Sequence, residues 1–182
     1  MPSGSSYLFA SADLTDVLQA HEAQIQSRVN SIPKDQILSV SDEELVNHLV
    51  AELSVEPLEF HEDHAEVEPA ETQIDVTQSW ERNPFGEELV VVPGNTVTIS
   101  IPFSGDIQLW SLRFSPVQGV FPTGSVSPSG ESQGFLYIMA QQPVDENPQN
   151  IKANIDRELQ EIRICLAHQR EKIVQFMADW SR

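Results

Sequence analysis

The chain has 182 residues, with 28 acidic and 10 basic side chains, a formal net charge of −18 and 40% apolar residues. This length suits one domain, and this composition is typical of a globular protein rather than of a disordered acidic chain. The charge argues against binding to nucleic acid or to an anionic membrane surface, because both are polyanions.

Two helices are predicted in the first third of the chain. Residues 12–31 place apolar side chains at helical spacing, with Ser11 or Asp13 as the N-cap and Pro33 ending the helix. A second helix begins with a capping box at 41–44, in which a serine N-cap is followed by a glutamate three positions later.

The middle of the chain predicts a small, mainly antiparallel β-sheet or sandwich. After an irregular acidic stretch at 55–68, five segments have strand patterns, namely 74–77, 88–92, 96–101, 109–114 and 134–139. The sequence Pro93-Gly94-Asn95 is a turn signal and predicts a hairpin between the second and third of these segments. Residues 120–130 are rich in turn-forming residues.

Residues 149–182 predict one long helix. Its apolar positions follow a repeat of about 3.5 residues, which is the period of a coiled coil. Gln169 is the polar interruption of the seam, where such a residue can set the register. The seam consists of Ile155, Leu159, Ile162, Leu166, Gln169, Ile173, Phe176 and Trp180.

These elements predict an α+β protein with two short N-terminal helices, the sheet, and a long C-terminal helix. We divide it into an acidic α+β domain at 1–148 and an association or linker helix at 149–182. Residues 1–80 hold 16 acidic and 2 basic side chains, whereas residues 149–182 hold 5 and 6. The acidic half is therefore either a solvated surface or a partner-facing one, and the nearly neutral helix is the predicted association element.

A cytoplasmic location is expected. No apolar run approaches the roughly 18 residues that a membrane span needs, and the first residues lack the pattern of a secretory signal. The single cysteine, Cys165, excludes an intramolecular disulfide and fits a reducing compartment.

The motifs give little indication of catalysis. No phosphate-binding glycine loop or nucleophile elbow is present, and no cofactor is predicted. We interpret Cys165 as a core thiol rather than a nucleophile. His61 and His64, three positions apart among carboxylates, are weak metal candidates, because a complete site needs three or four converging ligands. We therefore predict no catalytic residues and no metal site.

The most distinctive local segment is 99–116. Pro102 is expected to stop a strand, Phe103 to fill a core, and Gly105 and Asp106 to form a turn. An ion pair between Arg113 and Asp106 would then be structural. The alternative is that this loop faces a ligand.

The string IPFSGDIQLWSLRFSP at 101–116, with 121–126 and the long helix after it, resembles the N-terminal region of a family of poorly characterised bacterial proteins. In that family a helical connector leads to a restriction-endonuclease-like nuclease domain. The resemblance implies a regulatory or assembly module of a larger bacterial protein, with anti-phage defence as one context. No nuclease carboxylate–lysine motif lies within these residues, so nuclease activity is not carried over.

Three functions are compatible with the sequence. The first is a non-enzymatic interaction module that assembles through its C-terminal helix, with itself or with a downstream effector domain. The second is a small-ligand or metal-binding sensor or enzyme that uses the 99–116 loops. The third is an acidic nucleic-acid mimic, for which the carboxylates would have to form ordered rows.

Overall fold

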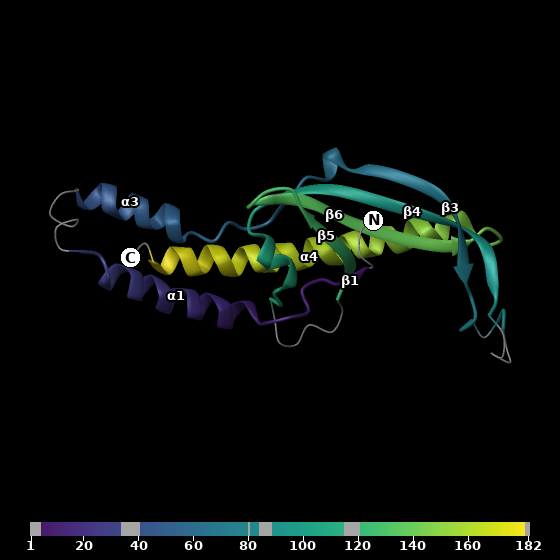
Figure 1. Cartoon of the computed structure of the whole chain (residues 1–182), viewed down its shortest axis with the longest axis horizontal. Helices are drawn as coiled ribbons and strands as arrows, with labels where there is room; N and C mark the ends of the chain where they lie inside the picture. Colours follow the sequence, from purple (N-terminus) through teal and green to yellow (C-terminus); the bar gives the residue numbers. More distant parts are fainter. Residues whose placement is uncertain (1–4, 34–40, 80, 84–88, 115–120, 181–182) are drawn as a thin grey trace.

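The computed structural model describes residues 5–33, 41–79, 81–83, 89–114 and 121–180. It confirms the α+β class, with α-helices and short 3₁₀-helices (η) around an antiparallel sheet (Figure 1). In chain order the elements are β1 (Ser6–Tyr7), α1 (Leu14–Asn30), α3 (Asp42–Leu53), β2 (Glu59–Phe60), η1 (Glu62–His64), β3 (Glu66–Asp75), β4 (Val91–Ser104), η2 (Ile107–Ser111), β5 (Thr123–Pro128), β6 (Gln133–Pro143) and α4 (Pro148–Trp180).

Local signals place the helices correctly. Asp13 caps α1 by accepting a hydrogen bond from the backbone N–H of Thr15 at 2.8 Å. The capping box of α3 is present, with the Ser41 and Glu44 side chains each bonded to the other's backbone. Among the described helices, none is both long and apolar enough to cross a lipid bilayer.

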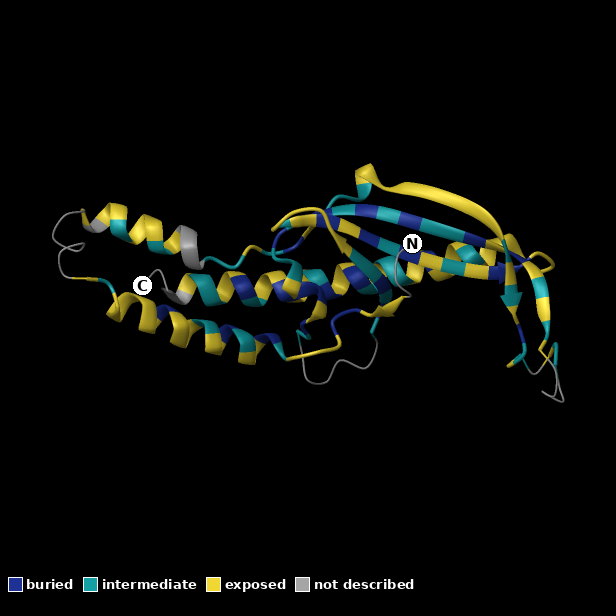
Figure 2. Cartoon of the chain, viewed as in Figure 1, coloured by how far each residue is buried: buried dark blue, intermediate teal, exposed yellow. Residues whose placement is uncertain are grey.

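The sheet has the order β1-β5-β6-β4-β2, and β3 pairs with β4 on the same side as β2. Strands β4 and β6 form its centre, with Ile99 opposite Ile138 and Ile101 opposite Leu136. These four side chains are buried and face α4, which lies along one face of the sheet (Figures 1 and 2).

The predicted hairpin at Pro93-Gly94-Asn95 is wrong, because these residues lie inside the single strand β4. Gly94 serves close packing rather than a turn: a Cβ added to it would lie 2.2 Å from Cδ1 of Ile74 on β3. Pro102 does not stop β4 either. Its carbonyl accepts from the N–H of His61 at 3.0 Å. Proline has no N–H to donate, but Pro102 lies just beyond the residues of β4 that pair with β2.

Three further segments differ from the prediction. The first half of the predicted strand 109–114 belongs to η2, because Asp106 caps this 3₁₀-helix through the Gln108 N–H at 2.9 Å. The turn-rich residues 120–130 contain β5, which pairs with β6. The irregular acidic stretch contains β2, η1 and the start of β3, since β4 supplies the hydrogen-bonding partner that local composition does not reveal.

The core lies between the sheet, α1, η2 and α4. It combines Ile101 and Phe103 of β4 with Leu14 of α1 and Ile162 and Ile173 of α4, all of them 2% exposed or less. Phe103 also packs edge-on against Trp110 of η2, with ring centroids 5.3 Å apart. The long helix is therefore part of this core and not an appendage.

A buried side-chain amide joins α4 to η2. Gln169 is 2% exposed, and its Nε2 donates to the backbone carbonyls of Leu109 at 2.9 Å and Leu112 at 2.6 Å. The Leu109 carbonyl also accepts from the Leu112 N–H at 3.2 Å, whereas the Leu112 carbonyl lies at the C-cap, where a helix provides no partner of its own. Gln169, the polar residue of the seam, thus donates to backbone carbonyls that lie 60 and 57 residues earlier in the chain.

Replacing Gln169 with leucine is expected to lower the free energy of unfolding by about 1–3 kcal/mol, because the Leu112 carbonyl loses this donor and the Leu109 carbonyl keeps only the Leu112 N–H. Gln175→Leu, at an exposed position of the same helix, is the control and is expected to change stability by less than about 0.5 kcal/mol. Urea denaturation followed by circular dichroism measures both. Equal stabilities of the two variants would contradict a structural role for the Gln169 amide.

Candidate functional site

The predicted association seam packs against the chain's own domain. Ile155, Ile162, Gln169 and Ile173 are buried. Leu159, Leu166 and Phe176 are half-buried and contact the same core, while the side chain of Trp180 lies outside the described residues. The 3.5-residue repeat therefore fits a helix that packs on its own sheet, and assembly through this helix stays a prediction.

Pro102, Phe103, Gly105 and Asp106 lie where β4 ends and η2 begins. Pro102 and Phe103 lie in β4, and Phe103 is buried. Gly105 has φ +105°, and a Cβ there would lie 2.4 Å from the carbonyl oxygen of Pro57, so this turn requires glycine. Asp106 caps η2.

Arg113 is held mainly through its backbone. Its N–H donates to the Ala12 carbonyl at 2.9 Å, and its own carbonyl accepts from the Leu14 N–H at 2.7 Å. These two bonds attach the start of α1 to the end of the η2 segment. The ion pair predicted with Asp106 is not among those formed by the described residues.

The two candidate metal ligands lie around η1 without converging. Nε2 of His61 lies 3.1 Å from Oγ of Ser104, and Nδ1 of His64 lies 3.2 Å from a carboxylate oxygen of Asp63. Within the described ranges, no three histidine, cysteine or carboxylate side chains are grouped closely enough to hold a metal ion. The histidines thus take hydrogen-bonding and surface roles here.

Cys165 has the environment of a core thiol. It is 4% exposed, and burial together with the nearby Glu161 raises its pKa to about 11. The thiolate is the nucleophilic form of cysteine, so at neutral pH this side chain is held in its unreactive form.

Basic side chains of α4 bind acidic residues near the start of the sheet. The Arg163 guanidinium donates to both carboxylate oxygens of Glu62, and Arg170 lies 3.6 Å from Glu59. The hydrogen bonds from Arg163 lower the pKa of Glu62, while its partial burial acts in the opposite direction. Part of the acidic half is therefore neutralised within the molecule.

The carboxylates of β3 are not neutralised in this way. Glu66, Glu68, Glu71 and Asp75 are exposed, and none of them belongs to an ion pair among the described residues. Their partners across the ladder on β4 are Ser100, Thr98, Asn95 and Val91, which are uncharged. The strand therefore carries carboxylates on both of its faces, with no cation opposite them.

Strand β3 is also an open edge of the sheet. All of its ten residues pair with β4, no described strand pairs with its other side, and every residue is exposed or half-buried (Figure 2). Such an edge presents backbone donors and acceptors to an added strand. Sequence reasoning missed this surface, although the alternation Glu66-Val67-Glu68 is a period-two signal.

An apolar row lies on β6, which β4 separates from β3, on the sheet face opposite α4. Phe135 and Met139 of β6 are 38% and 42% exposed, and half-buried Tyr137 lies between them. The register aligns Tyr137 with Ser100 and Glu66, and Met139 with Thr98 and Glu68. This face therefore combines apolar side chains at its centre with carboxylates at its margin.

No protein-family model, curated protein or solved structure matches the chain. The resemblance to a nuclease-associated bacterial family therefore stays a prediction.

The Glu62–Arg163 pair is expected to make stability depend on pH. Because its folded-state pKa is lowered, Glu62 adds stability above its unfolded pKa of about 4.3, and this contribution is lost as the pH falls through the lower folded-state pKa. Glu62→Gln should lower the free energy of unfolding by less than about 1 kcal/mol at neutral pH, since the pair is partly exposed. In acid the variant and the unmodified protein should have the same free energy of unfolding.

Urea denaturation at a series of pH values measures this difference. Glu43→Gln, at an exposed position of α3, removes the same charge without breaking this pair. An equal effect in that control would assign the pH dependence to net charge instead of the ion pair.

Proposed function

We propose that the chain is a non-enzymatic protein-interaction module whose partner adds an extended, basic segment to the free edge of β3. The observation that carries this proposal is the ten-residue edge strand with four carboxylates that form no ion pair among the described residues. Strand addition to an exposed sheet edge is a common mode of peptide recognition, in which backbone hydrogen bonds supply affinity and alternate side chains supply specificity.

The hydrogen-bond phase of the ladder indicates which backbone groups are available. The Val76 N–H donates to the Val90 carbonyl at 2.8 Å, so even-numbered residues of the adjoining β3 bond to β4. Odd-numbered residues, Val67 and Glu71 among them, then direct their N–H and C=O groups to the free edge. Pro69 falls in this set, and its missing N–H therefore costs no bond to β4.

The side chains determine the chemistry of the partner. Residues directly opposite each other in an antiparallel pair share a face, so lysine or arginine opposite Glu66 and Glu68 would lie beside those carboxylates. Residues between them would lie next to Val67 and Pro69 on the other face. The expected partner strand therefore alternates basic and apolar residues.

The same features disfavour pairing of β3 with a second copy of itself. An added β3 would bring carboxylates against carboxylates, and Pro69 would remove one donor from each strand. Acidic edge residues thus act against self-assembly while favouring a basic partner. This supports recognition of another protein, or of another segment of a longer protein.

The proposal replaces the α4 seam with β3 as the partner surface. It keeps the expectation of an interaction module, which in the context of the resemblance would serve a larger bacterial protein. The acidic nucleic-acid mimic is less well supported, because Glu66 and Glu68 lie on one face of β3 and Glu71 on the other, which leaves no long single row.

A labelled short peptide that alternates lysine and valine tests the proposal through fluorescence anisotropy. It is expected to bind saturably and to bind less tightly as salt increases. Val67→Pro should weaken binding about tenfold or more, because it removes a free-edge N–H without removing a bond to β4. Val67→Thr, which keeps the N–H, should bind as the unmodified protein does.

Charge is tested separately. The double variant Glu66→Gln/Glu68→Gln should weaken peptide binding, whereas Glu22→Gln/Glu43→Gln removes the same net charge from exposed helical positions and should change it little. The proposal fails if the two double variants bind alike, or if Val67→Pro binds as well as Val67→Thr.

A further inference from the structure

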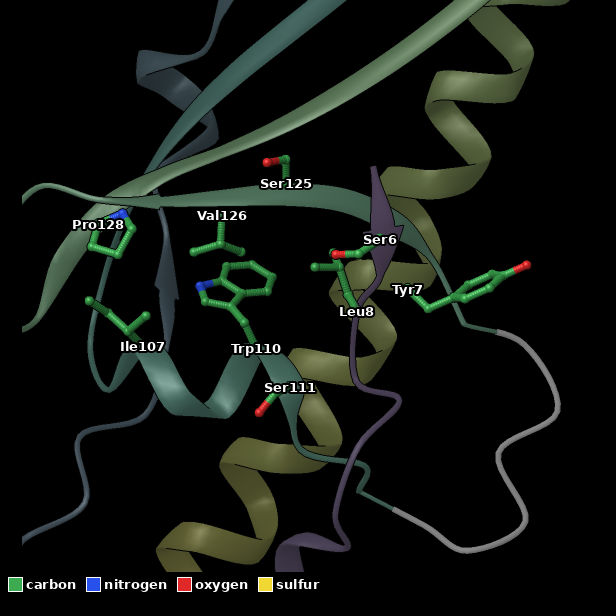
Figure 3. A pocket seen from close by; sticks show the side chains of 9 residues that line it. All are labelled: Ser6, Tyr7, Leu8, Ile107, Trp110, Ser111, Ser125, Val126 and Pro128. Atoms are coloured by element: carbon green, nitrogen blue, oxygen red, sulfur yellow. The ribbon is translucent and has the colours of Figure 1, made fainter. Parts of the chain in front are cut away.

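A cavity of about 510 Å³, open to solvent, lies between β5, η2 and the N-terminal strand β1 (Figure 3). This is the end of the sheet opposite to the edge formed by β3. Its walls include Leu8, Ile107, Trp110, Val126 and Pro128, and none of the residues that line it is charged. The volume is within the range of small-molecule sites, which are mostly apolar with a few polar groups.

Trp110 places an unused hydrogen-bond donor in the wall of this cavity. The residue is 3% exposed, and its indole Nε1 has no hydrogen-bond partner in the described part of the chain. Its ring packs on the core side against Phe9, Phe60 and Phe103, at centroid distances of 5.6, 6.1 and 5.3 Å. A buried indole N–H normally finds a partner, so this one requires an explanation.

The indole is oriented toward the cavity. Figure 3 shows its nitrogen on the side of the ring that faces Ile107, Val126 and Pro128, while Ser125 and Tyr7 point away. The hydroxyls of Ser6 and Ser111 already donate to the carbonyls of Gly124 and Gln108. Among the residues that line the cavity, the indole N–H is therefore the unused donor, and its nitrogen is buried in the cavity wall.

We infer that this cavity binds a small neutral, largely apolar molecule whose carbonyl oxygen accepts a hydrogen bond from the Trp110 indole. An apolar ligand matches the aliphatic walls, and one acceptor matches the one free donor. A charged ligand is disfavoured because burying it without a charged partner is costly. This site is independent of the proposed partner surface on β3.

Two probes of nearly equal shape test the inference, methyl naphthyl ketone and ethylnaphthalene, of which only the ketone has an acceptor. Each is titrated into nitrogen-15-labelled protein while the indole N–H resonances are followed by NMR. The resonance of Trp110 is identified by elimination with Trp80→Phe and Trp180→Phe, which leave the cavity unchanged in composition.

The ketone is expected to shift the Trp110 indole proton downfield in a saturable manner and to bind about tenfold more tightly than the hydrocarbon. Val126→Phe fills the cavity and should abolish binding of both probes. Val174→Phe, on the exposed face of α4, makes the same change elsewhere and should leave binding intact.

Three results would overturn the inference. They are the absence of a saturable shift of the Trp110 resonance with the ketone, equal affinity for the two probes, and unchanged ketone binding in Val126→Phe. Trp110→Phe keeps an aromatic ring but removes the indole N–H. The folded variant should therefore bind the ketone and the hydrocarbon with equal affinity.

Discussion

The side-chain amide of Gln169 connects α4 to η2, and the rest of the structure depends on this contact. Its two hydrogen bonds fix α4 against η2, and η2 in turn presents Trp110 to the aromatic cluster of the core. The carbonyls at the end of a short 3₁₀-helix would otherwise be buried without that donor, which is costly. This glutamine therefore ties α4 to η2, while the aliphatic side chains of α4 pack on the sheet.

From that junction, charge and burial separate the two faces of the sheet. On the inner face, α4 covers β4 and β6 with aliphatic side chains, and its arginines bind Glu59 and Glu62 at one margin. On the outer face, Phe135 and Met139 are uncovered and β3 carries carboxylates without cations. Four of the 28 acidic side chains thus lie along an open strand edge without a cation beside them.

Sequence reasoning succeeded where the determining forces are local. The capping box at Ser41 and the apolar repeat from Ile155 defined helices because caps and periodicity act within a few residues. It failed at Gly94, whose turn-like neighbourhood instead permits contact with Ile74 of another strand. It also recognised Gln169 as the exception in the seam, but its acceptors lie sixty residues away and could not be assigned. The edge of β3 and the Trp110 cavity depend in the same way on contacts that are distant in sequence.

The position of α4 has a consequence for how the protein is made. Ile162, Gln169 and Ile173 complete a core whose other members begin at Leu8, so residues from both ends of the chain must meet before that core closes. During synthesis the sheet leaves the ribosome ahead of the helix that covers it, and its inner face stays exposed until then. Folding therefore depends on contacts of long sequence separation, which form slowly, and the native state is reached only after the last helix has emerged.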